Sequence, residues 1–123
     1  METYKEFIAK KKLEVKKGKK FNTKDIGRNG YRVWKTEAMT LMKQTDHDEK
    51  VFIIERNVLE HVVGKTVTDI KPGYKQYRIG YFIIGKNGKR NGIWTWGQYC
   101  PNIPLNDFSK LINLAKKEKT IIY

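Results

Sequence analysis

The chain has 123 residues, a net charge of +13 and an apolar fraction of 39%, which predicts one basic, soluble domain with a single core. No apolar run approaches the roughly 20 residues of a membrane-spanning helix, and residues 1–8 lack the basic-then-apolar order of a signal peptide. We therefore expect a cytoplasmic protein without membrane association. The lone cysteine, Cys100, excludes an intrachain disulfide and, with only two histidines, a four-ligand Cys/His zinc site.

The first predicted element is a short N-terminal helix, because Tyr4, Phe7, Ile8 and Lys11 fall at helical spacing. A lysine tract follows, and Gly18 interrupts it. Like charges repel one another and glycine weakens a helix. Residues 15–33 are therefore predicted to be mostly loop, and residues 1–35 to be partly flexible.

The middle of the chain predicts two more helices around one strand. Apolar residues at helical spacing indicate a helix over 36–44, and the apolar run 51–54 indicates a short strand. An acidic turn, 45–49, separates them. Asn57 with Glu60 has the spacing of a capping box, which predicts a short third helix that ends at residue 64.

Residues 77–84 and 93–99 are aromatic and β-branched runs, typical of the two strands of a hairpin. A type I′ turn at residues 87–88 would pair Tyr81 with Trp94 and Ile79 with Trp96; a looser loop over 85–92 would change these pairs. Both faces of the hairpin carry apolar groups, so we expect it to lie centrally in its sheet.

A C-terminal helix is predicted to start at Pro104 or Asn106, and residues 120–123 to add a final edge strand. The predicted apolar face of the C-terminal helix consists of Leu105, Phe108, Leu111, Ile112 and Ala115. The predicted fold class is therefore α+β: a small antiparallel sheet with a central hairpin, about 77–99, packed by two or three helices. The prediction is one domain over residues 1–123.

The charge is uneven along the chain and favours a polyanionic partner. The net charge is +8 over residues 1–35, −3 over 36–62 and +8 over 63–123, which predicts a bipolar surface if the three parts do not interleave in the fold. Uncompensated charge of this size repels itself, and nucleic acid is the commonest polyanion that would neutralise it. The first hypothesis is therefore a non-enzymatic protein that binds DNA or RNA.

Three groups of residues are candidates for that binding. The lysine tract and the basic hairpin loop 86–92 would contact phosphates, and lysine favours backbone contact over base readout; a solvated tract and ordinary turn chemistry explain the same residues without function. Trp34 lies in a polar, basic stretch and is the aromatic expected to be exposed for stacking, whereas Trp94 and Trp96 are expected in the core. The predicted nucleic-acid-binding residues are Lys10, Lys11, Lys12, Lys16, Lys17, Lys19, Lys20, Arg28, Arg32, Trp34, Arg78, Lys86, Lys89 and Arg90.

Signals for catalysis are few, and no cofactor motif or metal site is predicted. The acidic turn 46–49 would suit a divalent cation, as in metal-dependent nucleases, but a polar turn explains it equally well. His61 is expected to be structural and Cys100 a packed thiol.

A small, basic chain with N-terminal helices before a strand that contains Tyr77 and Arg78 is loosely similar to the RelE-like ribonuclease toxins. That resemblance implies a small ribonuclease as one alternative, although no catalytic motif carries over. The other alternative is an adaptor or inhibitor, phage- or mobile-element-encoded, whose basic surface docks an acidic protein partner.

Overall fold

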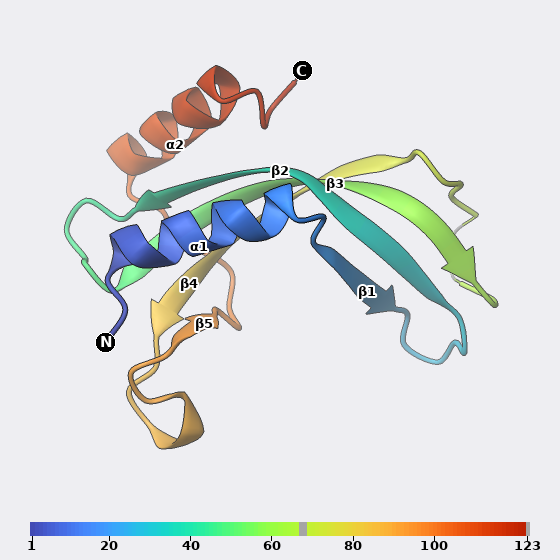
Figure 1. Cartoon of the computed structure of the whole chain (residues 1–123), viewed down its shortest axis with the longest axis horizontal. Coiled ribbons are helices and arrows are strands. Elements are labelled where there is room, and N and C mark those ends of the chain that lie inside the picture. Colours follow the sequence, from blue (N-terminus) through green and yellow to red (C-terminus); the bar gives the residue numbers. More distant parts are fainter. Residues whose placement is uncertain (67–68, 123) are drawn as a thin grey trace.

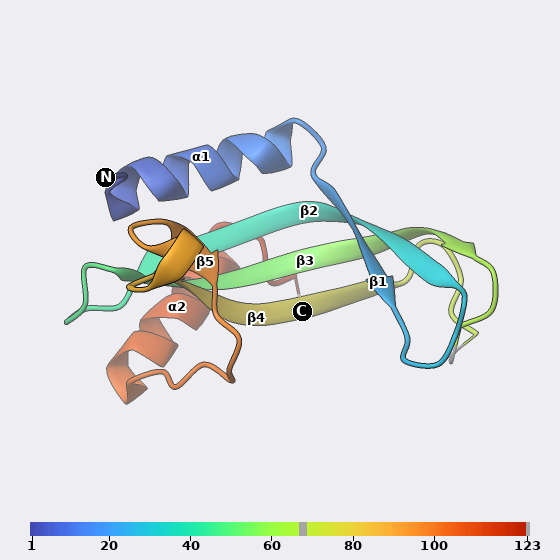
Figure 2. The same cartoon turned by 90° about the horizontal axis from the view of Figure 1, so that it is seen from below.

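The computed structural model describes residues 1–66 and 69–122. Five antiparallel strands follow one another in the order β1-β2-β3-β4-β5, and the sheet curls into a half-barrel with one helix on each face (Figures 1 and 2). The elements are α1 (Tyr4–Lys16), β1 (Lys20–Lys24), β2 (Tyr31–Lys43), β3 (Lys50–Val63), β4 (Lys75–Ile84), the 3₁₀ turn η1 (Gly88–Arg90), β5 (Trp94–Trp96) and α2 (Leu105–Lys117). The α+β class is confirmed, but strands dominate the fold.

Helix α1 extends to Lys16, two residues into the stretch 15–33 that was predicted to be mostly loop. It begins with a capping box between Thr3 and Glu6 and ends before Gly18, which has a φ of 86°. Carboxylates relieve the repulsion expected among the lysines: the Nζ atom of Lys10 lies 3.1 Å from Glu2, and that of Lys12 lies 3.2 Å from Glu118. Lysine is also a good helix former. The stretch 15–33 therefore contains the end of α1, all of β1 and the start of β2, while residues 17–19 and 25–30 are loop as predicted.

The helices predicted over 36–44 and 57–63 are wrong, because both segments are strand. β2 pairs with β3 from Tyr31↔Val63 to Lys43↔Val51, with irregularities between residues 33 and 34 and between 36 and 38. These irregularities break the alternation of a regular strand. Helices cover both sheet faces, so consecutive apolar residues occur, and together the two effects imitate helical spacing.

The hairpin prediction is confirmed only as a pair of strands. Strands β4 and β5 pair through Phe82↔Trp96 and Ile84↔Trp94, so the type I′ register is wrong and the looser loop is correct. β5 has three residues and is the last strand of the sheet. The hairpin is therefore not central; the centre of the sheet is β3, whose residues 51–55 are all buried.

Each sheet face has its own apolar core. Under α1, Phe7 packs with residues of β2 to β5, and its ring stacks on Trp94 at 4.9 Å between centroids. Under α2, Leu111 and Ala115 pack against Phe52, Ile54 and Tyr81. The two cores hold the same end of the sheet from both sides (Figure 2).

Helix α2 is confirmed where it was predicted, although its apolar face is only partly buried. Leu111 and Ala115 are fully buried, whereas Leu105 and Phe108 are exposed. Residues 120–122 are not a strand, and Tyr123 lies outside the described residues. Neither helix in the described part of the chain is long and apolar enough to cross a membrane.

Asp107 joins α2 to the turn between β2 and β3. Its carboxylate accepts hydrogen bonds from the backbone N–H of Thr45, at 2.9 Å, and from the Thr45 hydroxyl. These hydrogen bonds hold the pKa of Asp107 below its usual value. Its position in the first turn of α2 also suits a negative charge.

We expect Asp107→Asn to lower the free energy of unfolding at neutral pH, because the amide loses the charge that these donors stabilise. A carboxyl group whose pKa is lower in the folded state stabilises the fold fully above its unfolded pKa, about 3.9. The difference between wild type and variant should therefore shrink as the pH falls through the folded pKa. Urea unfolding at several pH values measures it, with exposed Asp48→Asn as the control. A difference that does not change with pH would contradict this role of the charge.

Candidate functional site

The sheet face under α1 changes from apolar to polar halfway along the strands. At the covered end it carries Val51 and Ile53 of β3; further along β3 the same face carries Glu55 and then Asn57. Glu55 pairs with Arg78 of β4, and Asn57 lies between Thr36 of β2 and Gln76 of β4. Helix α1 does not extend over this second half (Figure 2), so polar side chains line the inside of the half-barrel there.

Glu55 is the centre of a buried charge network. Its side chain has no exposed surface, and its Oε1 atom accepts hydrogen bonds from Arg78 Nε at 2.7 Å and from Asn57 Nδ2 at 3.3 Å. Lys19 Nζ lies 3.9 Å from the second oxygen. Partial burial lowers the pKa of Lys19, and the nearby carboxylate of Glu55 opposes that shift. The carboxylate thus orients Arg78 and Asn57 from below.

Aromatic rings hold the Arg78 guanidinium from both edges of the sheet. Its central carbon lies 4.2 Å from the ring centroid of Phe21 on β1 and 4.8 Å from that of Trp96, at the end of β5. Trp96 also lies over Gly80, where a Cβ atom would come within 2.6 Å of the indole, so glycine is required for this close approach. These contacts connect the two edge strands across the open side of the half-barrel.

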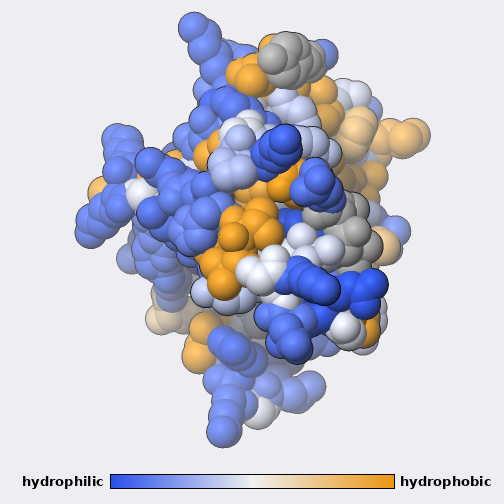
Figure 3. All heavy atoms as spheres, turned by 90° about the vertical axis from the view of Figure 1, so that its right-hand side faces the viewer, coloured by the Kyte–Doolittle hydropathy of each residue, from blue (hydrophilic) through white to orange (hydrophobic). Residues whose placement is uncertain are grey.

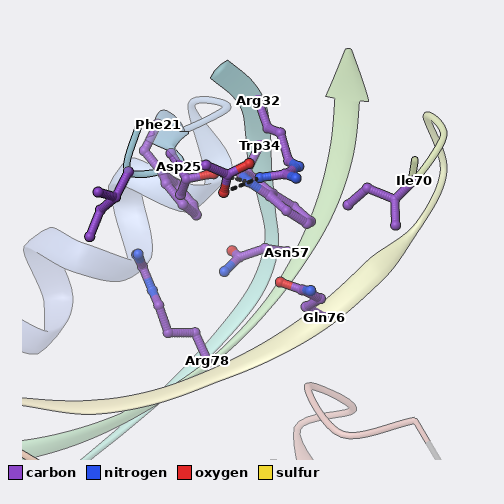
Figure 4. Close-up of a pocket in the computed structure, with 10 residues that line it drawn as sticks. Phe21, Asp25, Arg32, Trp34, Asn57, Ile70, Gln76 and Arg78 are labelled. Atoms are coloured by element: carbon purple, nitrogen blue, oxygen red, sulfur yellow. Dashed lines mark hydrogen bonds and ion pairs between the residues drawn. The ribbon is translucent and has the colours of Figure 1, made fainter. Parts of the chain in front are cut away.

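Beside this cluster is a cavity of about 570 Å³, within the usual size range of ligand sites. Figure 4 shows its labelled side chains converging from β1, β2, β3, β4 and the β3–β4 loop. The aromatic walls are Phe21 and Trp34, and the amides are Asn57 and Gln76. The remaining lining residues are Thr23, Asp25, Ile26, Arg32, Ile70 and Arg78. We call this space the half-barrel pocket.

Side-chain hydrogen bonds fix the walls on the β1–β2 side of the half-barrel pocket. Arg32 Nη1 lies 2.9 Å from a carboxylate oxygen of Asp25, and Trp34 Nε1 donates a hydrogen bond of 2.8 Å to the Thr23 hydroxyl. Figure 4 shows these side chains on one side and Ile70 on the other. The half-barrel pocket between these side chains and Ile70 is therefore open in the structure, and no side chain has to move to form it.

A second cavity, of about 490 Å³, lies at the loop end of the half-barrel and shares Ile70 with the half-barrel pocket. Arg28 of the β1–β2 loop lines it together with Lys65 and Lys71 of the β3–β4 loop. The two loops touch, since Gly30 N–H donates to the Lys65 carbonyl at 3.0 Å. We call these three cations the loop-end cluster. Seen from this end, hydrophilic residues surround a small apolar area (Figure 3).

The structure brings together only four of the predicted nucleic-acid-binding residues here. Arg32, Trp34 and Arg78 line the half-barrel pocket, and Arg28 belongs to the loop-end cluster. Lys19 lies close to Glu55, and Lys20 forms an ion pair with Glu60 at 2.9 Å, which lowers the pKa of that carboxyl. The other predicted residues lie elsewhere: Lys10, Lys11, Lys12 and Lys16 on α1, Lys17 just after it, and Lys86, Lys89 and Arg90 between β4 and β5.

The β4–β5 loop lies at the opposite end of the molecule from the loop-end cluster (Figure 1). The three parts of the chain also interleave, because the acidic middle part supplies β3 at the centre of the sheet. Its carboxylates pair with cations from both basic parts, as Glu55 does with Lys19 and Arg78. The expected bipolar surface is therefore not formed.

The expectation that Trp34 is exposed is wrong, since only 4% of its surface is accessible. β1 covers it, and its polar atom is satisfied by Thr23. Trp94 is in the core as expected, whereas Trp96 is 36% exposed. Trp34 therefore shapes the half-barrel pocket from within.

Sequence reasoning missed Lys65, Lys71, Asn57, Gln76 and Phe21. Lys65 and Lys71 are isolated in the sequence, so they do not form a basic tract that would indicate a binding site. Gly30 and Gly64 were the available signal: a Cβ atom on Gly30 would lie 2.2 Å from the Lys65 carbonyl, and Gly64 has a φ of 72°. These glycines let the two loops come together.

The catalytic alternatives gain no geometric support. In the acidic turn, Asp46 accepts from Gln44, Asp48 pairs with Lys43 and Glu49 pairs with Lys86, and the described residues contain no group of three or more His, Cys, Asp or Glu placed to hold a metal ion. His61 lies on β3 and is exposed, not on a helix.

Two further expectations were also wrong. Cys100 is exposed rather than packed. Among the described residues, one helix precedes the strand that contains Tyr77 and Arg78, so the several N-terminal helices on which the resemblance to RelE-like toxins rested are not found there.

Comparisons with known proteins give no match: no protein-family model, no curated protein and no solved structure is significantly similar to this chain.

Proposed function

We propose that the chain is a non-enzymatic nucleic-acid-binding protein that contacts phosphates through the loop end of its half-barrel. The observation that carries the proposal is the loop-end cluster, in which Arg28, Lys65 and Lys71 from two touching loops line one cavity. Arg32 and Arg78 line the adjoining half-barrel pocket. Phosphate oxygens are the natural ligands of such a group of cations.

The ion pairs of the molecule favour this end over the lysines of α1. Lys10, Lys11 and Lys12 each have a carboxylate partner, and positive charge at the C-terminal end of α1 is stabilised by the helix dipole. Asp69 also lines the cavity of the loop-end cluster, but none of the three cations has a carboxylate within 4.0 Å among residues 1–66 and 69–122. The three cations outnumber the carboxylate of Asp69 in this cavity, and a phosphate backbone would neutralise the excess charge while releasing counterions.

The test is fluorescence anisotropy with labelled single- and double-stranded DNA and RNA at about 50 and about 200 mM salt. We expect binding whose affinity falls by orders of magnitude between the two concentrations, since several phosphate contacts are lost. Probes that stay intact in the presence of magnesium support the non-enzymatic reading. No binding at the lower salt concentration would refute the proposal and leave the acidic protein partner as the reading to test.

A further inference from the structure

The half-barrel pocket contains a buried acceptor that no group among residues 1–66 and 69–122 satisfies. Asn57 is 3% exposed, and its Oδ1 atom has no hydrogen-bond partner although the residue lines the cavity. Its Nδ2 atom donates to the Glu55 carboxylate at 3.3 Å. A carboxylate only accepts, so this contact fixes the amide orientation and leaves the oxygen for another donor. An unsatisfied buried acceptor is costly, which points to a ligand with an N–H group.

The walls of the half-barrel pocket suit a flat, aromatic ligand. Phe21 and Trp34 supply apolar surface from β1 and β2, and Ile70 lies across the opening (Figure 4). The Arg78 guanidinium lies close to the rings of both Phe21 and Trp96, and Gln76 adds an exposed amide at the pocket. Aromatic rings together with a few fixed polar groups are the usual means of holding an unpaired base.

The adjoining cavity would accommodate the phosphates of the nucleotide that carries such a base. Ile70 lines both cavities, and the loop-end cluster lines the second one. A nucleotide whose base occupied the half-barrel pocket would therefore have its phosphates close to Arg28, Lys65 and Lys71. Only an unstacked base can enter this pocket, because a duplex keeps its bases stacked and paired.

We propose that the half-barrel pocket takes one unpaired nucleobase of a single-stranded nucleic acid and that Asn57 Oδ1 accepts a hydrogen bond from its exocyclic amino group. This inference rests on the proposed function and narrows it: it predicts preference for single strands over duplexes. Adenine, cytosine and guanine carry such an amine, which projects from the ring. On the pairing edge of uracil and thymine the one N–H donor is the ring N3–H, which lies between two carbonyl groups that cannot donate. The inference therefore also predicts preference for oligo(C) over oligo(U).

The first variant to compare with wild type is Gln76→Trp, in which a large ring on an exposed position fills the pocket mouth without touching the core. We expect it to weaken single-strand binding by about tenfold or more, the amount that loss of base stacking costs, and to leave duplex affinity unchanged. Gln98→Trp adds the same ring at an exposed position outside the pocket and is the matched control. A Gln76→Trp variant that affects both nucleic acids equally, or neither, would overturn the inference.

Asn57→Ala tests the hydrogen bond itself. It should reduce the preference for oligo(C) over oligo(U), which we expect to be severalfold in wild type; Asn22→Ala, on an exposed position of β1, should preserve it. Replacing a buried residue such as Asn57 can also destabilise the fold. A second test therefore uses the wild-type protein, which is titrated with CMP and UMP while the NMR signal of the Trp34 indole N–H is followed. A larger shift with CMP supports the inference.

The outcomes separate the two proposals. Salt-sensitive binding with equal affinity for single strands and duplexes would retain the proposed function and refute the pocket inference. No nucleic-acid binding at low salt would refute the proposed function, and the nucleotide titration would then decide the pocket alone: no shift of the Trp34 signal with CMP overturns it.

Discussion

Replacing Arg78 with methionine is expected to lower the free energy of unfolding by about 2–4 kcal/mol. This is less than the cost of breaking a fully buried ion pair from one side, because Glu55 is buried but the Arg78 side chain is 38% exposed. Methionine keeps most of the apolar stem but removes the guanidinium. Glu55, which is fully buried, then loses its hydrogen bond of 2.7 Å to Arg78. It retains the neutral amide of Asn57, at 3.3 Å, and the distant charge of Lys19, at 3.9 Å. Chemical denaturation measures the effect.

Lys75→Met is the matched control, because Lys75 lies on the same strand and forms an ion pair with Glu37 that is largely open to solvent. An exposed pair contributes about 0–1 kcal/mol. The double variant Glu55→Leu with Arg78→Met should recover most of the loss, since no charge is then left buried alone. If Arg78→Met costs no more than Lys75→Met, Glu55 does not depend on its pairing with Arg78.

The second large effect is expected from alanine substitution of all three cations of the loop-end cluster. Affinity for nucleic acid should fall by about a hundredfold or more at low salt, and the slope of log affinity against log salt should decrease by roughly two to three, because three phosphate contacts are lost. Stability should change little, since these side chains are at the surface. Anisotropy titrations over a range of salt concentrations measure both quantities.

The control for the loop-end triple variant is the alanine substitution of Lys5, Lys89 and Lys116, which are exposed and lie away from the two loops. This control changes the net charge by the same amount. A control that weakens binding as much as the loop-end variant would mean that net charge alone attracts the nucleic acid, and would contradict a localised site.

Local patterns predicted the termini of the fold better than its centre. The two terminal helices are capped or strongly amphipathic segments whose signals lie within a few residues, and both were found. The segments 36–44 and 57–63 were misread because their conformation depends on pairing between β2 and β3, which their own sequences do not specify. Tertiary pairing commonly overrides weak local preference.

The candidate site was predictable only in part for the same reason. Arg28, Arg32, Trp34 and Arg78 were identified from charge and aromatic content, but their neighbours Lys65, Lys71 and Asn57 join them through strand pairing and loop contact. The spacing of Asn57 and Glu60 predicted a helix cap, but Asn57 is a buried residue of β3. Its side chain donates a hydrogen bond to Glu55 instead of capping a helix. The dense positive charge of the lysine tract directed the prediction to α1. There, carboxylates of residues 2, 14 and 118 form ion pairs with the lysines.

The central claim is that nucleic acid binds at the loop end of the half-barrel, and an NMR titration of the labelled protein with a short single-stranded oligonucleotide tests it most directly. The account predicts that the shifted backbone signals include those of residues 24–32, 64–66 and 69–72, together with the indole signal of Trp34. Shifts confined to α1 or to the β4–β5 loop, or no shifts at low salt, would contradict it.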